Sequence, residues 1–400
     1  MWHLLLALTA VIIVGQGLGR LSRFIGQPPV IGEIVAGILI GPSLLGRIAP
    51  QAFLFILPPD VAPLLGVVAQ LGVVLYMFSV GLDLNPDLVR GRFYTTMATA
   101  HASIALPFVL GSALALYLYP RFSTSDVPFT HFALFLGVAM SITAFPVLAR
   151  ILADLGMAKT TLGVLALTCA AIGDVTAWCL LAFVVGVVHA AGGSALVAVL
   201  LTAGFIAVML VVVRPVFERL TRESSSAGPM RLAFTLALTL LPISALITQA
   251  IGIHAIFGAF LLGVAIPHDS AIARSLTRAI DRPVTVLLLP AFFALTGLRT
   301  EIGLVSGVYE WSICGLIVLV ATMGKFGGAV AGARVSGLNW RMAAGLGILM
   351  NTRGLMELIV LNVGLDLGIL SPTLFTMLVL MAVVTTVATT PVLQRLFPSG

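Results

Sequence analysis

The stretch GVAMSITAFPVL, residues Gly137–Leu148, places two hydroxyl side chains and a proline in the middle of a long apolar run. A second stretch, GILMNTRGLMEL, residues Gly347–Leu358, places an amide, a hydroxyl and a glycine in another such run. A broken membrane helix exposes backbone carbonyls and half-helix dipoles that can face an ion in a cavity. The two stretches therefore predict two interrupted membrane helices, although a proline kink beside a small-residue packing face would give a similar pattern.

The composition of the whole chain places it in a membrane. Hydrophobic residues make up 60% of the 400 residues and charged residues 9%, and the mean hydropathy is +1.16. Soluble domains carry about 25% charged residues, and disordered chains combine low hydrophobicity with high charge. The net charge of +6 is typical of basic cytoplasmic loops, so no nucleic-acid partner is expected. The sequence predicts an all-α polytopic membrane protein.

The number of spans follows from the apolar runs, since a helix needs about 20 apolar residues to cross a bilayer. Thirteen candidate spans lie near residues 3–19, 28–46, 62–81, 93–119, 131–152, 161–188, 194–213, 231–250, 252–267, 284–298, 309–333, 342–363 and 371–393. The ninth and tenth are short and contain glycine or proline. We therefore expect about thirteen transmembrane helices.

The basic residues orient these spans. Sixteen of the 21 Lys and Arg fall on one side of the membrane and three on the other, and two lie within spans. The positive-inside rule then predicts a multi-pass protein of the cell (inner) membrane, with its N-terminus outside and its C-terminus cytoplasmic. The longest polar connection, Glu218–Pro229 with its run Ser224–Ser226, reads as a cytoplasmic linker. Because the chain stops soon after the last span, no soluble regulatory domain is expected.

The two halves of the chain resemble each other. The second span contains VIGEIVAGILIGP, which resembles IGIHAIFGAFLLGVAIP in the ninth span. The third span ends in YMFSVGLDLN, which resembles FFALTGLRTEI at the end of the tenth span. The fifth and twelfth spans, which hold the two predicted breaks, show the same offset of seven spans. An odd offset inverts the second copy across the membrane, as in secondary transporters that work by alternating access. We expect one transmembrane domain, with a first repeat at 1–190, a linking helix and loop at 191–230, and a second repeat at 231–400.

Asp174 is the ionisable residue with the strongest functional prediction. It lies about halfway along the sixth span, in ALTCAAIGDVTAWCLLAF. A charge near the bilayer centre costs at least about 2.5–3.5 kcal/mol, so a chain that retains one generally uses it. A carboxylate can hold a proton or an alkali cation, but not both, which couples the movements of the two. The alternative is a structural carboxylate that caps an interrupted helix or pairs with a neighbour.

Lys325, Arg353 and Glu357 are the other candidates within the spans. Lys325 lies mid-span and is one of only two lysines among 21 basic residues, so a compact ammonium that can lose its proton fits better here than arginine. It is interpreted as an ion-pair partner of Asp174, or as a fixed counter-charge. Arg353 and Glu357 share a helix face at i, i+4 and could be a self-satisfied structural pair.

Other functional classes lack their motifs. The sequence has no Walker loop, no dinucleotide fingerprint and no convincing nucleophile triad, so neither an ATP-driven pump nor an enzyme is expected. The histidines are scattered, and Cys169, Cys179 and Cys314 lie singly in apolar runs. We therefore expect no cofactor, and no metal beyond a transported monovalent cation.

Several stretches together resemble the monovalent cation–proton antiporter superfamily, and its second cation–proton antiporter family in particular. They are similar to those of plant and bacterial cation/proton exchangers and run in order over nearly the whole chain: SITAFPVLARIL, IGIHAIFGAFLLGVAIP, LLLPAFFALTGLRTEI, MGKFGGA and MNTRGLMELIVLNVG. The resemblance implies a sodium/proton-antiporter-like fold of inverted repeats, in which two interrupted helices cross near Asp174. It also implies a homodimer with a dimerisation domain and a moving core.

The resemblance also implies roles for individual residues. Asp174 would bind the ion, with Thr143 and Ser141 as further ligands and Lys325 and Arg353 as basic partners. The supporting residues around the two breaks and the aspartate would be Phe145, Pro146, Gly173, Asn351, Thr352 and Glu357. Members of the family commonly carry Asp, Asn or Gln just before the essential Asp, where this chain has Gly173. A paired aspartate is associated with electrogenic exchange, so its absence favours electroneutral one-for-one exchange.

Three functions remain open from the sequence. The first is exchange of Na⁺ or K⁺ for protons, with Asp174 binding the proton and the cation competitively. The second is sodium-coupled symport of an organic anion on the same scaffold, with Lys325 and Arg353 binding the anion. The third is an ion channel, which would show flux faster than a carrier cycle and no counter-transport.

Overall fold

The computed structural model describes residues 2–83, 93–123, 126–189, 195–222 and 227–397, and all of its regular structure there is helical. Four of the helices are halves of interrupted spans and are described below. The uninterrupted helices of the first half are α1 (Trp2–Phe24), α2 (Pro29–Ile40), α3 (Leu45–Ile48), α4 (Pro50–Ile56), α5 (Val61–Asp83), α6 (Phe93–Phe122), α9 (Thr161–His189) and α10 (Ala195–Val208).

The second half continues the same pattern, with helices α11 (Arg214–Arg222), α12 (Ala227–Ile251), α13 (Ala255–Ala265), α14 (Ala271–Pro283), α15 (Leu289–Arg299), α16 (Gly307–Val335) and α19 (Pro372–Leu396). Single π-helical turns join α10 to α11 and α14 to α15. The linker predicted at 191–230 is described only in part, and its run Ser224–Ser226 lies outside the described residues.

Eleven helical segments of the described chain are long and apolar enough to cross a membrane, and a bent pair adds a twelfth. Each lies on one of the predicted spans, so the prediction of an all-helical polytopic membrane protein is confirmed. The predicted span at 252–267 is the exception, because its helix α13 has only 11 residues. At about 1.5 Å per residue, such a helix covers about half of a bilayer core. The turn at Gly252, with φ of 95°, and Pro267 bound this short helix.

Both predicted interruptions are present. In the fifth span α7 (Phe129–Ser141) ends before Ile142 and α8 begins at Phe145 and runs to Asp154. Pro146 lies in the first turn of α8. Backbone N–H groups in the first turn have no acceptor within the helix, so the N–H that proline lacks costs no helical hydrogen bond. In the twelfth span α17 (Trp340–Met350) and α18 (Leu355–Asp366) are bent by 45°.

Gly354 is required at the second break. Its φ of 156° and ψ of −132° belong to a region that is essentially restricted to glycine. A Cβ at this position would also lie 2.9 Å from the Cγ2 atom of Val147 in α8. The second break is therefore shaped by the close approach of the first one.

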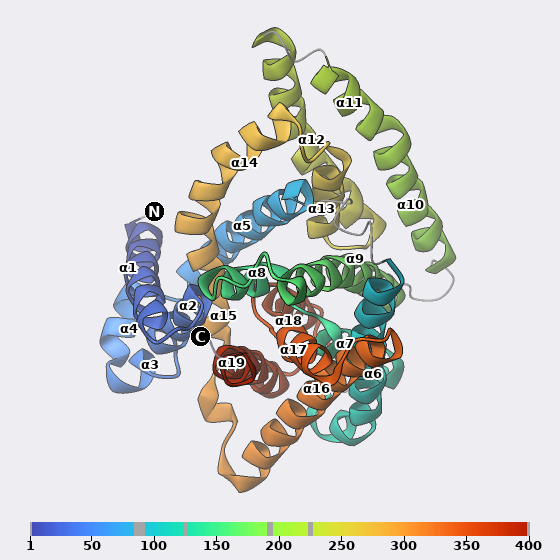
Figure 1. Ribbon diagram of the computed structural model, residues 1–400. Coiled ribbons are helices and arrows are strands. Elements are labelled where there is room, and N and C mark those ends of the chain that lie inside the picture. Colours follow the sequence, from blue (N-terminus) through green and yellow to red (C-terminus); the bar gives the residue numbers. More distant parts are fainter. Residues whose placement is uncertain (1, 84–92, 124–125, 190–194, 223–226, 398–400) are drawn as a thin grey trace.

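The helices pack as two bundles (Figure 1). The first, here called the scaffold bundle, contains α1, α2, α5 and α12–α15. The second, here called the broken-helix bundle, contains α6–α9 and α16–α19. Helices within each bundle approach one another closely, whereas close backbone approaches between the bundles are few and the bundles meet through contacts of buried apolar side chains. One of these is the edge-to-face contact of the Trp178 and Phe257 rings, whose centroids are 5.5 Å apart.

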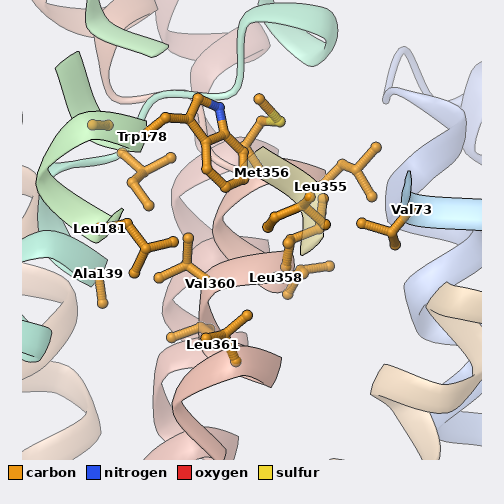
Figure 2. Packing of buried hydrophobic residues seen from close by; sticks show 14 of the residues in the cluster. Val73, Ala139, Trp178, Leu181, Leu355, Met356, Leu358, Val360 and Leu361 are labelled. Carbon is orange, nitrogen blue, oxygen red and sulfur yellow. The ribbon is translucent and has the colours of Figure 1, made fainter. Parts of the chain in front are cut away.

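The half-helix α18 lies in the interior of the protein. Every residue from Leu355 to Gly364 is buried. Figure 2 shows Trp178 and Leu181 of α9 on one side of α18, and Val73 of α5 on the other. A largely apolar helix that is buried on all faces is expected for the centre of a membrane bundle.

Two glycine contacts in the scaffold bundle follow the internal repeat. Gly81 of α5 meets Gly263 of α13, and Gly297 of α15 meets Gly37 of α2, each with backbone against backbone. Gly81 and Gly297 occupy matching places in YMFSVGLDLN and FFALTGLRTEI. The third span thus packs on the ninth as the tenth packs on the second, which is the relation that an inverted repeat produces.

Replacing Gly297 with alanine is expected to destabilise the protein, because the added Cβ would collide with the backbone of Gly37. Overpacking of this kind costs about 1–3 kcal/mol. Gly315→Ala in α16 is the matched control, since its Cβ would have no neighbour within 4 Å among the described residues. Thermal unfolding of the purified variants measures the difference, and equal stability of the two would contradict the proposed close contact.

Candidate functional site

The two breaks contact each other. The Ala144 amide donates to the Thr352 carbonyl at 3.0 Å, and the Thr143 hydroxyl donates to the Met350 carbonyl at 2.9 Å. Each break therefore satisfies backbone groups that the other leaves without helical partners. The predicted crossing of two interrupted helices is confirmed at this point, where four half-helix ends meet.

Lys325 binds the broken end of α7. Its side chain, 1% exposed, extends from α16, and Nζ donates to the Ser141 carbonyl at 2.5 Å and to Thr143 Oγ1 at 2.6 Å. The C-terminal end of a helix carries partial negative charge and unbonded carbonyls, so an ammonium there is favourable. Lys325 therefore compensates the half-helix dipole of α7.

Arg353 binds the same end of α7 from the opposite break. Its guanidinium donates to the Met140 carbonyl at 2.8 Å and to the Ala139 carbonyl at 3.4 Å. It also forms the i, i+4 ion pair with Glu357 at 3.0 Å, and neither side chain is exposed. The pair expected from the spacing is thus present, but it is not self-contained, because Arg353 also links the second break to the first.

Asp174 lies in α9, which packs against α7, α8 and α17. The residue is 3% exposed, and its Oδ1 atom has no hydrogen-bond partner among the described residues. No ion pair of 4.0 Å or less joins this carboxylate to Lys325, and both residues lie in the described part of the chain. The Lys325 ammonium is bound to the first break instead. Direct pairing of Asp174 with Lys325, one of the two interpretations from sequence, is therefore not the arrangement in this structure.

The remaining candidate residues surround the crossing. Asn351 Oδ1 and Thr352 Oγ1 are buried in the second break and have no hydrogen-bond partner in the part of the chain that the structure describes. The Ser141 hydroxyl donates to the Gly137 and Ile104 carbonyls, so its backbone oxygen, rather than its side chain, faces Lys325. Phe145 and Pro146 begin α8. At Gly173 an added Cβ would meet only Ile104 Cδ1, at 3.9 Å.

Thr386 of α19 belongs to this cluster and was missed from the sequence. Its hydroxyl donates to the Arg353 carbonyl at 2.6 Å and accepts from the Arg353 amide at 2.9 Å. It thereby holds both backbone groups of the residue that links the two breaks. Thr386 lies in an uncharged span among several other threonines, so no local signal distinguishes it.

The chain is similar to known proteins over nearly its whole length. Residues 5–397 match the family described as sodium/hydrogen exchanger, transmembrane. The chain is 43% identical over 403 residues to the Na⁺/H⁺ antiporter NhaS4 of Synechocystis, covering 99% of this chain and 98% of that protein. It is 33% identical over 385 residues to K⁺/H⁺ antiporter 1 of Saccharomyces cerevisiae, covering 94% of this chain and 44% of that protein. The chain therefore spans less than half the length of the yeast relative.

A solved structure gives the same fold. The sodium proton antiporter MjNhaP1 from Methanocaldococcus jannaschii superposes with a TM-score of 0.73 at 13% identity, covering 98% of this chain and 96% of that one. At this identity the match concerns the fold alone. The match of the family over nearly the whole chain, together with the full-length relative, establishes membership: the protein belongs to the sodium/hydrogen exchanger family of multi-pass membrane transporters.

Proposed function

We propose that this protein exchanges a monovalent cation, Na⁺ or K⁺, for protons across the membrane by alternating access. The observation that carries the proposal is the buried Asp174 carboxylate, with an unpartnered oxygen, beside the crossing of two broken helices. The names of the relatives support the same reaction, since one is a Na⁺/H⁺ antiporter and another a K⁺/H⁺ antiporter.

In the proposed cycle Asp174 binds a proton or a cation, one at a time. A buried carboxylate that holds neither would be an uncompensated charge, which strongly disfavours the empty state. Thr143 and Ser141, with the unpartnered oxygens of Asn351 and Thr352, are the proposed neighbouring ligands. Hard alkali cations prefer such oxygen ligands.

Lys325 and Arg353 have a different role in this proposal. Both keep the carbonyl end of α7 neutralised, so the crossing persists whether or not Asp174 holds a cation. Four further positions support this arrangement of the two breaks in the proposal: Gly173, Phe145, Pro146 and Glu357.

The two other functions considered from sequence are not favoured. An organic-anion symporter would require Lys325 and Arg353 to be available for the anion. In the structure their donors are directed to backbone carbonyls, Thr143 and Glu357. The family to which the chain belongs comprises exchangers, which disfavours a channel as well.

The arrangement in the membrane is part of the same proposal. We propose that the N-terminus lies outside and the C-terminus on the cytoplasmic side of the cell membrane, and the asymmetry of the basic residues supports this orientation. We infer two inverted repeats at 1–190 and 231–400, joined by the segment 191–230. By analogy with the family, the protein works as a homodimer, with the broken-helix bundle moving against the scaffold bundle.

Exchange in proteoliposomes tests the proposed function. Purified protein is reconstituted with a pH-sensitive dye inside the vesicles, and Na⁺, K⁺ or Li⁺ is added outside over a range of pH. We expect cation-driven proton release that saturates with Na⁺ or K⁺. Uptake of an organic acid without proton movement, or flux without counter-transport, would contradict the proposal.

The absence of a second carboxylate at Gly173 predicts electroneutral exchange. Because one proton replaces one cation on Asp174, an imposed membrane potential is expected to leave the exchange rate unchanged. The site has steric room for a side chain, so Gly173→Asp can be compared with the wild-type protein. The added carboxylate should make the exchange rate of this variant voltage-dependent. A voltage-dependent rate in the wild-type protein would rule out one-for-one exchange.

A further inference from the structure

One polar cluster outside the crossing joins the two bundles. Arg299, at the last residue of α15, forms an ion pair of 2.8 Å with Asp366, at the last residue of α18. The same Nη1 atom donates to Asn362 Oδ1 at 2.9 Å. The Asn362 amide in turn donates to the Thr296 hydroxyl of α15 at 2.9 Å. Two turns of α15 are thus bound to two turns of α18.

This ion pair differs from the others in the protein. Among the described residues, each of the other ion pairs joins residues at most four positions apart. Of these ion pairs between described residues, only Arg299–Asp366 joins distant segments, and these belong to different bundles. An exposed pair is generally worth little, but here the arginine also binds Asn362, which is 6% exposed and fixed by further bonds to Thr296 and to the Leu358 carbonyl.

The cluster forms part of the wall of a cavity between the bundles. The cavity has a volume of about 210 Å³ and is lined by Gln70, Gln249 and His254 from the scaffold side and by Val363 and Asp366 from α18. Because its walls come from both bundles, a movement of one bundle along the other must change both the cavity and the bonds of Arg299.

We propose that Arg299, Asn362 and Asp366 form a latch that holds the bundles in the conformation seen here and opens once in each transport cycle. The proposal rests on the alternating access of the proposed function. Arg299 is here a positioning residue, since it lies apart from the crossing and acts on α18, whose other end begins at the second break. Weakening the latch is expected to shift the population away from the conformation that contains this cavity.

Cysteine accessibility tests the latch without relying on transport. The background protein carries Cys179→Ala, which removes the exposed native cysteine. Val74→Cys is then added to this background and places a thiol in the cavity wall. Labelling by a small methanethiosulfonate reagent is then measured in full-length protein in vesicles. We expect Arg299→Gln and Asp366→Asn each to slow labelling about threefold, and the exchanged pair Arg299→Asp with Asp366→Arg to restore it.

The controls separate the latch from the proposed function. The Asp366 side chain is 41% exposed and asparagine has nearly the same shape, so Asp366→Asn is expected to fold like the wild-type protein. Arg121→Gln removes an arginine of α6 that donates to the Tyr117 carbonyl and lies over the Tyr117 ring, so it should leave labelling unchanged. When Arg299→Gln or Asp366→Asn is combined with Asp174→Asn, the change in labelling rate should persist even if cation–proton exchange is lost. Unchanged labelling in both Arg299→Gln and Asp366→Asn would overturn the latch and leave the proposed function untouched.

Discussion

Asp174→Asn is expected to abolish cation-dependent proton exchange. Asparagine keeps the shape of the side chain but can neither bind a proton at neutral pH nor offer a charge to a cation. Removing one partner of a buried charge contact costs about 2–5 kcal/mol of binding free energy, which corresponds to a loss of cation affinity of about thirtyfold or more. Dye-quench assays in proteoliposomes measure the loss, and the variant should fold normally because a buried carboxylate has been neutralised.

The matched control for this variant is Asp154→Asn. Asp154 forms an exposed ion pair with Arg150 at 2.9 Å, and such pairs contribute at most about 1 kcal/mol. This variant should therefore exchange cations at the wild-type rate. If Asp174→Asn were as active as Asp154→Asn, the central role of Asp174 would be wrong.

Competition on one carboxylate also has a pH signature. Where the proton occupies Asp174, each unit of acidification should raise the apparent cation KM about tenfold, because the proton concentration rises tenfold. The maximal rate at saturating cation should change much less. A cation KM that does not depend on pH would indicate separate sites for the proton and the cation.

Arg353→Met is expected to give the largest loss of stability. Arg353 and Glu357 are both fully buried, so the variant leaves a carboxylate without its partner and the Ala139 and Met140 carbonyls without a donor. Breaking a buried pair from one side costs about 3–5 kcal/mol, whereas replacing both partners by apolar residues is often nearly neutral. The double variant Arg353→Met with Glu357→Met should therefore recover a substantial part of the loss.

Thermal unfolding in detergent distinguishes these cases. Arg150→Met is the control, since it removes the basic partner of an exposed i, i+4 pair, and it should change stability by less than about 1 kcal/mol. If the single and double variants at 353 and 357 were equally unstable, the buried charge of Glu357 would not be the cause. The loss would then come from the carbonyls of α7 alone.

The outline of the fold was available from sequence because a bilayer imposes a local rule. Backbone groups in hydrocarbon must bond within their own helix, so an apolar run of sufficient length is a helix wherever it lies. For the same reason Ser141–Pro146 and Asn351–Gly354 could be recognised as breaks. The span at 252–267 was harder to interpret, since the length of α13 depends on the turn at Gly252 and on its packing against α5.

The partners of the charged side chains were harder to predict from the sequence. Lys325 could be recognised as a costly charge, but its binding to the Ser141 carbonyl depends on where α16 lies relative to the end of α7. Thr386 and Arg299 carry no special local pattern, and their contacts reach across 33 and 67 positions of the chain. Such contacts result from the packing of distant helices.

The sequence by itself determined that this is a membrane protein with two broken helices, an internal repeat and a few charges in the apolar spans. These properties follow from the cost of placing polar groups in hydrocarbon, which each segment meets on its own. Only the tertiary structure decided that Lys325 and Arg353 share the carbonyl end of α7, that Asp174 keeps an unpartnered oxygen, and that Arg299 links the bundles. Those arrangements depend on which helices lie side by side, and close packing of the whole chain sets that.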